Sequence, residues 1–297
     1  MTILSHDNLE GPPEPAFAAP DARLTDRVTY SVPDDPWAKR TLIKAVELLT
    51  GQPRLQRLYD RYMESRGAED DFWRSAVAYL RLDVRFDRSA LDAIPRTGPL
   101  ILIANHPFGV LDGIAAGHIL SAVRGDFKLI AHAALGRAQV FRPYLIPIAF
   151  EGDSAALRAN VQSKRMARAH LRDGGSLIIF PAGRVSTAKK MFGTAVDDPW
   201  KLFPATLIQT SGAPVLPVHF EGQNGRLFHF VSKFSGTLRE ALILREVARR
   251  IGGQITAHVG APMDPADLAR FQERQALLDH LRARVYGLGG GTGAAGR

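Results

Sequence analysis

A histidine and an aspartate stand on one turn of the segment ILIANHPFGVLDG, residues 101–113. His106 ends an apolar run, and Asp112 precedes the next one, with Pro and Gly between them. A carboxylate beside one imidazole nitrogen fixes the tautomer and leaves the other nitrogen to take a proton. The spacing therefore indicates a candidate general base, His106, oriented by Asp112. The residue types leave a structural alternative open, in which Asp112 only caps the following helix and His106 bonds to buried backbone.

Strand and helix patterns alternate around this turn. Short apolar runs predict strands at DVRF, PLILIA, FKLIA, YLIPIAF, SLIIFPA, APVLPVHF and QITAHVG, and helical stretches separate several of them, DGIAAGHILSAV, SAALRANVQSKRMARAHLRD and WKLFPATLIQTS. This rhythm predicts an α/β fold with a largely parallel central sheet flanked by helices. In such sheets, reactive groups collect where the carboxyl end of a strand opens into a loop. The turn that carries His106 and Asp112 is such a place.

Composition divides the chain of 297 residues into four parts. We predict a flexible N-terminal arm at residues 1–34, an N-terminal helical region at 35–82, the α/β domain at 83–287 and a flexible tail at 288–297. The closing stretch PADLARFQERQALLDHLRARVYGL predicts one helix that begins at a cap formed by Asp264 and Pro265.

Two amphipathic helices are predicted in the N-terminal region. The first presents one apolar face, made of Leu42, Ile43, Val46 and Leu49. The second has an apolar stripe and a basic stripe, made of Leu55, Leu58, Tyr59 and Tyr62 on one side and of Arg54, Arg57 and Arg61 on the other. The basic stripe is typical of a solvated helix face, and it is also compatible with a membrane-surface helix.

The net charge of +8 and the isoelectric point near 10.0 predict attraction to an anionic partner. An acidic protein, an anionic membrane leaflet and a nucleic acid all satisfy that condition. The absence of Cys excludes disulfides and thiolate nucleophiles. Polar residues interrupt the apolar stretch 98–123 at its centre, so we expect no membrane span there. The opening residues lack the features of a signal peptide, and we expect a cytoplasmic protein.

The segment NHPFGVLDG resembles the His-to-Asp signature of the glycerolipid acyltransferases, the superfamily that includes 1-acylglycerol-3-phosphate acyltransferase. The usual pattern has four residues between His and Asp, whereas this chain has five. The hemolysin-like bacterial branch tends to show the longer loop with the same Pro and Gly. The difference therefore narrows the resemblance to that branch.

Two later blocks follow in the expected order. FPAGRVS, residues 180–186, resembles the Phe-Pro-Glu-Gly block, and VLPVHFEGQNGRLF resembles the later Val-Pro-Val strand. The similarity spans about residues 83–260. The superfamily's Glu falls on Ala182, and Arg184 stands where relatives have a smaller or acidic residue. Arg184 is either a clamp for a phosphate or carboxylate or an ordinary surface ion-pair residue. The resemblance implies a substrate-binding set, Asn105, Gly109, Pro181, Gly183, Arg184 and Ser186.

The resemblance also implies a reaction. An acyl group would move from acyl-CoA or acyl-carrier protein to a hydroxyl of a lysophospholipid or lyso-aminolipid, with His106 as the base and Asp112 orienting it. The acceptor can attack the thioester directly, so no serine or cysteine nucleophile is required. Backbone N–H groups near Gly109 or at the helix start would stabilise the oxyanion. We expect no metal and no cofactor besides the acyl donor, and a protein that is peripheral to the inner face of the membrane.

Three other functions stay open at this point. The acceptor group could be an amine, which would make the protein an N-acyltransferase that forms an aminolipid. The chain could also be a catalytically silent, membrane-associated lipid-binding protein that keeps the turn for its structure. Nucleic-acid binding ranks last, because the basic residues are dispersed and no nucleic-acid module is recognised.

Overall fold

The computed structural model describes residues 28–29, 36–67, 70–148, 154–188, 190, 193–234 and 236–290. The predicted N-terminal arm lies outside the described residues except for Val28 and Thr29, and so does the predicted tail from residue 291 onward.

Within the described part, seven strands form one sheet with the order β1-β7-β6-β2-β5-β3-β4. Every neighbouring pair is parallel except β6 and β7. The strands are β1 (Asp83–Arg85), β2 (Leu100–Ala104), β3 (Phe127–His132), β4 (Leu145–Ile148), β5 (Ser176–Ile179), β6 (Val215–Phe220) and β7 (Gln254–Val259). Six of the seven predicted apolar runs contain one strand each, and β3 extends one residue beyond its run, to His132. The prediction of an α/β fold with a largely parallel sheet is confirmed.

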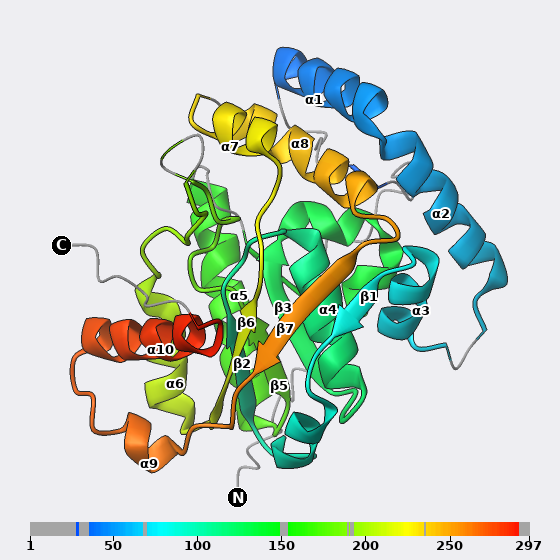
Figure 1. The fold of residues 1–297 in the computed structure, drawn as a ribbon. Coiled ribbons are helices and arrows are strands. Elements are labelled where there is room, and N and C mark those ends of the chain that lie inside the picture. Colours follow the sequence, from blue (N-terminus) through cyan, green and yellow to red (C-terminus); the bar gives the residue numbers. More distant parts are fainter. Residues whose placement is uncertain are drawn as a thin grey trace, which may run out of the picture.

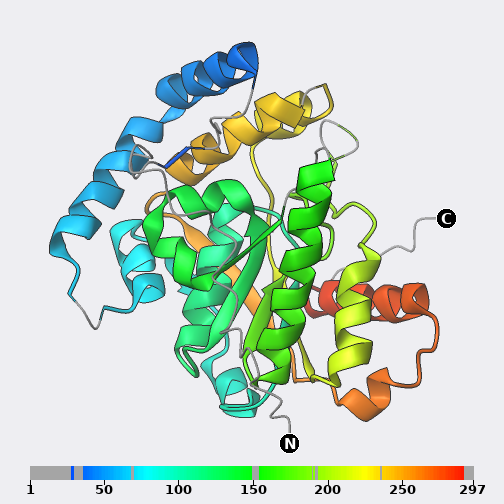
Figure 2. The ribbon, with the colours of Figure 1, turned by 180° about the vertical axis from the view of Figure 1, so that it is seen from behind.

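Helices cover both faces of the sheet (Figure 1; Figure 2 shows the opposite side). One layer packs against the face formed by Leu100 and Leu102, and its helices are α2 (Gln52–Ser65), α3 (Phe72–Tyr79), α4 (Val110–Ser121) and α8 (Gly236–Arg249). The other layer packs against the face formed by Ile101 and Ile103, and its helices are α5 (Ser154–Arg172), α6 (Leu202–Ser211) and α10 (Arg274–Leu288).

The central strand β2 explains why the sheet is covered on both sides. All five of its residues are fully buried, and alternate side chains enter the two apolar clusters. A continuous apolar run is typical of a parallel strand between two helical layers. This placement brings the carboxyl end of β2, with the turn that follows it, to the middle of the sheet edge.

Two parts of the helical prediction were wrong or incomplete. The closing helix is divided into α9 (Pro265–Leu268) and α10, because the chain leaves helical geometry at residues 269–273. The predicted cap is present, since the Asp264 side chain accepts a hydrogen bond from the Ala266 N–H at 2.7 Å. Sequence reasoning did not identify α7 (Arg226–Ser232) and α8 between the last two strands.

The helix α1 (Trp37–Thr50) departs from its predicted apolar face. It packs on α8 along the outside of the molecule and buries Ile43 and Glu47. Leu42 and Leu49 are exposed, because α1 covers α8 on one side and no other described helix or strand covers its outer side (Figure 1). In α2 the predicted stripe is confirmed, with Leu55 and Tyr62 buried and the basic stripe exposed, Arg54, Arg57 and Arg61.

Candidate active site

The turn after β2 brings His106 and Asp112 together. His106 Nδ1 lies 3.0 Å from Asp112 Oδ2. Nδ1 is buried, whereas the His106 side chain as a whole keeps 17% of its surface exposed. The exposed side of the ring is therefore the side away from the carboxylate. The ring also stacks on Phe180, with centroids 4.1 Å apart and planes 21° apart. Two contacts thus fix the imidazole while Nε2 remains the nitrogen available for a proton.

Asp112 stands in the first turn of α4 and is fully buried. Its Oδ2 accepts hydrogen bonds from the N–H groups of Phe108 and Gly109, at 2.8 and 2.9 Å. Burial raises the pKa of the Asp112 carboxyl, while His106 and the two backbone N–H groups oppose that rise. The carboxylate therefore acts both as the cap predicted by the structural alternative and as the group that orients His106.

The turn depends on Gly109. Its φ is 77°, in the region that favours glycine, and a Cβ there would lie 3.1 Å from Val185 Cγ2. Because the Gly109 N–H bonds to Asp112, that donor is already used. The expectation that backbone N–H groups near Gly109 or at the helix start stabilise the oxyanion stays a prediction. The N–H groups of Val110 and Leu111, at the start of α4, have no partner within the helix and are the remaining donors of the kind expected there.

A second aspartate, Asp197, supports the backbone of the turn. Its Oδ1 accepts hydrogen bonds from the His106 N–H at 3.2 Å and from the Ser186 hydroxyl. Its Oδ2 accepts a hydrogen bond from Trp200 Nε1 at 2.9 Å. Sequence reasoning missed Asp197, which is 91 residues from His106 along the chain. No local pattern connects the two positions.

Asn105 and Ser186 stabilise the backbone of the site through hydrogen bonds. The Asn105 side chain donates to the Phe220 carbonyl at 2.9 Å and accepts from the Phe220 N–H at 2.7 Å, which ties the end of β2 to the end of β6. The Ser186 N–H donates to the His106 carbonyl at 2.8 Å. Both side chains are buried. Their observed contacts are with the protein, and the predicted contact with substrate remains a prediction.

A pocket opens beside His106. Among the predicted site residues, Gly109, Gly183 and Arg184 also line it. The rest of its wall comes from the start of α4, from β3 and the segment after it, from the FPAGRVS block and from α8. It includes Val110, Leu129, His132, Leu135, Phe141, Phe180, Arg239, Glu240 and Ile243. The pocket therefore combines two imidazoles, those of His106 and His132, with an apolar wall and charged groups.

Two residues of the FPAGRVS block have other surroundings. Pro181 is buried, and its carbonyl accepts a hydrogen bond from the Lys201 N–H at 2.9 Å. The Ala182 methyl is buried in the apolar cluster between the sheet and α5, α6 and α10. A small apolar residue at position 182 suits that cluster, and its side chain does not line the pocket.

A second, almost wholly apolar cavity adjoins this pocket. Three residues line both of them, Val110, Leu135 and Phe141. The wall of the apolar cavity comes mainly from α2, α3, α4, α8 and the segment 134–141, and includes Leu55, Leu58, Tyr62, Ala76, Ile114, Ala138 and Leu244. Helices that sequence reasoning assigned to a separate N-terminal region thus form one side of this cavity.

Comparison with known proteins identifies the class. The family model described as "Acyltransferase" matches residues 72–251, which is more than half of the chain. The chain belongs to this acyltransferase family, and the resemblance to the glycerolipid acyltransferases is confirmed.

Two curated relatives share this region. The chain is 28% identical over 160 residues to a lyso-glycine lipid O-acyltransferase of Phocaeicola vulgatus, covering 54% of each protein. It is 29% identical over 161 residues to a lyso-glycine lipid O-acyltransferase of Bacteroides thetaiotaomicron, covering 54% of this chain and 56% of the relative. The chain spans about half the length of these relatives.

A solved structure resembles the chain more distantly. It is the 1-acyl-sn-glycerophosphate acyltransferase PlsC of Thermotoga maritima, with a TM-score of 0.49 and 19% sequence identity. The comparison covers 88% of this chain and 83% of that one.

Proposed function

We propose that the protein transfers a fatty acyl group from acyl-CoA or acyl-carrier protein to a hydroxyl group of a lysolipid. One observation carries the proposal. His106 stands beside a buried carboxylate and lines a pocket that adjoins an apolar cavity. A base at one end of an apolar cavity suits a reaction between a proton-bearing nucleophile and a fatty chain.

The reaction requires little of the protein beyond a base and an oxyanion site. The acceptor hydroxyl gives its proton to His106 Nε2 while its oxygen attacks the thioester carbonyl carbon. The oxygen of the tetrahedral intermediate carries the negative charge, and the Val110 and Leu111 N–H groups at the start of α4 are its proposed donors. The C–S bond then breaks, and the leaving thiolate takes the proton from the imidazolium. The products are an ester and a free thiol.

The apolar cavity is the proposed site of the fatty chain. Its lining has almost no polar surface, and it lies beside the pocket of His106. Burying one methylene contributes about 0.8 kcal/mol. A chain that fills the cavity therefore gains most of its binding free energy away from the reacting carbonyl.

Filling the cavity should change the preferred chain length. We expect Ala138→Phe to lower kcat/KM for palmitoyl donors by about 10²-fold, since excluding four methylenes costs about 3 kcal/mol. Hexanoyl donors should react about as fast as with the wild type. Ala138→Ser keeps the side chain small and is the matched control. An equal loss for both donor lengths in Ala138→Phe would contradict the assignment of this cavity.

The acceptor is proposed to carry an anionic head group. Arg184 and Arg239 line the pocket of His106, and a guanidinium binds carboxylate and phosphate oxygens through paired donors. The curated relatives are named for a lyso-glycine lipid, and this favours a lyso-aminolipid over a lysophospholipid as the acceptor. We keep the lysophospholipid as the second candidate because its phosphate meets the same charge requirement.

The proposed acyl transfer is tested with defined pairs of acyl donor and acceptor. The purified protein is incubated with acyl-CoA or acyl-carrier protein and with lyso-glycine lipid, lysophosphatidic acid or a simple amine acceptor, and the products are identified by mass spectrometry. A new ester supports the proposal, and its acceptor selects the head group. A new amide would contradict transfer to a hydroxyl group and support N-acylation. Lipid binding without any product would contradict acyl transfer and support a catalytically silent lipid-binding protein.

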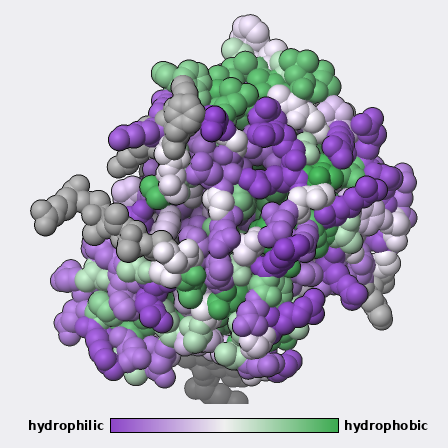
Figure 3. Space-filling view, viewed as in Figure 1, coloured by the Kyte–Doolittle hydropathy of each residue, from purple (hydrophilic) through white to green (hydrophobic). Residues whose placement is uncertain are grey.

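We further propose that the protein works at an anionic membrane surface. In the part of the chain that the structure describes, no helix is long and apolar enough to cross a membrane. Apolar side chains instead gather on the surface of α1 and α7 along one edge of the molecule (Figure 3). We call this the α1–α7 surface, and its apolar members are Trp37, Leu42, Leu48, Leu49, Leu227, Phe230 and Phe234.

The charges on the α1–α7 surface favour a lipid partner. Its exposed ionisable residues are Lys44, Arg226 and Lys233, all of them basic, whereas Glu47, the acid of α1, is buried. Aromatic and leucine side chains interleaved with basic residues are typical of helices that lie in a membrane interface. Both helices pack on α8, which also lines the pocket and the cavity. Docking of this surface would bring the lipid close to the site.

Acidic substitutions at apolar positions of this surface should release the protein from membranes. Leu49 and Phe234 are 84% and 74% exposed, and each such side chain contributes about 1.5–3 kcal/mol when buried. We expect the double variant Leu49→Glu, Phe234→Glu to lower partitioning onto vesicles of phosphatidylglycerol and phosphatidylethanolamine by ~10²-fold or more. The control is Leu202→Glu, at an exposed leucine on α6. Equal sedimentation of the double variant, Leu202→Glu and the wild type with vesicles would exclude this surface.

A further inference from the structure

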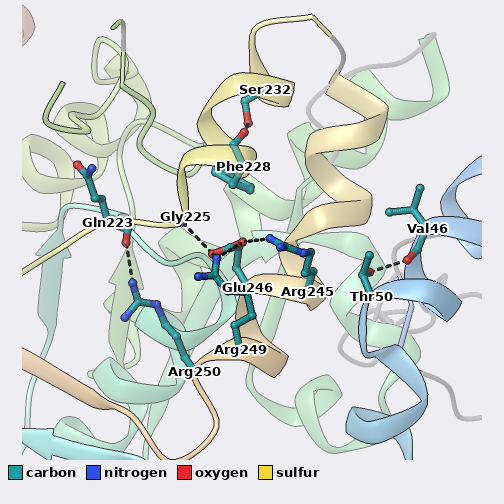
Figure 4. Close-up of polar contacts among 10 residues, drawn as sticks. All are labelled: Val46, Thr50, Gln223, Gly225, Phe228, Ser232, Arg245, Glu246, Arg249 and Arg250. Carbon is teal, nitrogen blue, oxygen red and sulfur yellow. Dashed lines mark hydrogen bonds and ion pairs between the residues drawn. The ribbon is translucent and has the colours of Figure 1, made fainter. Parts of the chain in front are cut away.

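Arg250 joins two loops that border the candidate site. It follows the end of α8, and its guanidinium carbon lies 3.8 Å from the centroid of the Phe108 ring. Its Nη2 donates a hydrogen bond to the Gln223 carbonyl at 2.6 Å, a contact that Figure 4 shows. Its Nε is buried and has no hydrogen-bond partner among the described residues. The half-buried Arg250 side chain is thus fixed by the face of the Phe108 ring and by the Gln223 carbonyl.

Phe108 is the residue through which Arg250 reaches Asp112. The Phe108 N–H donates directly to Asp112 Oδ2, and the ring is buried. The Cζ tip of the ring meets Gly222, where a Cβ would lie 2.8 Å from that carbon. The ring thus contacts the Arg250 guanidinium over its face and Gly222 at its tip, and its own backbone N–H binds Asp112.

Gln223 extends this connection to the other side of the site. Its backbone carbonyl binds Arg250, while its side-chain Oε1 accepts a hydrogen bond from the Ala195 N–H at 2.6 Å. Two residues further along, Asp197 binds the His106 N–H. Arg250 thus contacts the loop that follows β6, and this loop in turn binds the segment that holds His106.

The charges around Arg250 are few. Glu246 and Arg249 face it from α8, and Asp112 faces it from α4, where His106 is the titratable side chain beside Asp112. Glu246 is also bound by Arg245, by Arg249 and by the Gly225 N–H, as Figure 4 shows. Arg249, one residue away from Arg250, is more than half exposed and pairs with Glu246 at 3.3 Å. Arg249 therefore offers a matched arginine for comparison.

We propose that Arg250 is a positioning residue for the reaction proposed above, which holds Phe108 so that Asp112 stays ionised and in register with His106. The cation favours the charged form of the buried carboxylate, and the stacking of the guanidinium on the ring fixes the turn that presents it. The inference rests on the proposed acyl transfer but concerns a residue that does not line the pocket.

The test compares Arg250→Met with Arg249→Met, followed by Arg250→Lys. We expect Arg250→Met to lower kcat by about 10-fold to 10²-fold with KM little changed, because a small displacement of a catalytic pair costs that much. The acid limb of its kcat/KM profile should move to higher pH, since Asp112 loses a neighbouring cation. Arg250→Lys restores the charge without the planar stack, and it should restore the acid limb and only part of kcat. Arg249→Met should behave like the wild type.

A second measurement separates this inference from the proposed activity. The carboxyl carbon of Asp112 is followed by NMR through a pH titration, with Asp112→Asn used for the assignment, in the wild type and in each variant. A higher midpoint in Arg250→Met than in Arg249→Met supports the inference even if no acyl transfer is detected. If Arg250→Met does not fold, the same comparison is made with Arg250→Lys, whose kcat must fall while its Asp112 midpoint stays near that of the wild type. Equal kcat, pH profile and Asp112 midpoint in the Arg250 and Arg249 variants would overturn it.

Discussion

His106→Ala should lower kcat/KM for acyl transfer by about 10²–10⁴-fold, the usual contribution of a general base. The loss follows from the geometry of the turn, because His106 is the imidazole that lines the pocket beside a buried carboxylate. The fold should persist, since the ring is partly exposed and its backbone contacts with Ser186 and Asp197 do not need the side chain. Product formation and the melting temperature are measured together.

A second histidine variant serves as the control for His106→Ala. His280 stands on α10 and contacts Phe271, with ring centroids 4.7 Å apart. His280→Ala should leave the rate unchanged. Retention of wild-type kcat/KM by a folded His106→Ala protein would rule out the proposed mechanism while leaving the family assignment intact.

Asp112→Asn should reduce kcat/KM by about 10²-fold or more, because an amide no longer selects the imidazole tautomer that leaves Nε2 to accept a proton. The substituted side chain has nearly the same shape, and its oxygen can still accept the N–H groups of Phe108 and Gly109. The fold should therefore persist, which circular dichroism and the melting temperature check.

The stability of this variant should depend on pH in a defined direction. Burial raises the pKa of Asp112 above its ordinary value of 3.8. A group with a raised folded-state pKa stabilises the fold below its unfolded pKa, and this contribution is lost as the pH rises through the folded pKa. The wild type therefore bears the cost of the buried charge at neutral pH, and Asp112→Asn does not. The advantage in unfolding free energy of the variant over the wild type should shrink as the pH falls toward 4. An advantage that grows on acidification would contradict the raised pKa.

Local sequence patterns were sufficient for the sheet. Most of the strands are short apolar runs, although β1 has one apolar residue, Val84, and β2 could be placed in the interior because all of its residues are apolar. The pairing of His106 with Asp112 was also predictable, since the two residues lie on one turn and their distance depends on a few backbone angles. The expected reaction came from the resemblance of this turn to the His-to-Asp signature of the glycerolipid acyltransferases.

Local sequence patterns could not predict contacts between segments that are far apart along the chain. Asp197 and His106 are 91 residues apart, and Asn105 and Phe220 are 115 residues apart, so only the folded chain brings them together. The helix α1 was misjudged for a related reason. A periodic apolar stripe shows that a helix has a face, but it does not show how much of that face another element covers.

Part of the wall of the apolar cavity and the two reacting groups come from different parts of the chain. The family match begins at residue 72, so α2 lies outside it, although this helix forms part of the cavity wall. The imidazole and its carboxylate lie within the family match, on the turn into α4. If the cavity holds the fatty chain as proposed, exchanging α2 between homologues should alter which chains are accepted while leaving His106 and Asp112 unchanged. Under that proposal, the range of acyl chains can diversify through a helix that takes no part in bond making.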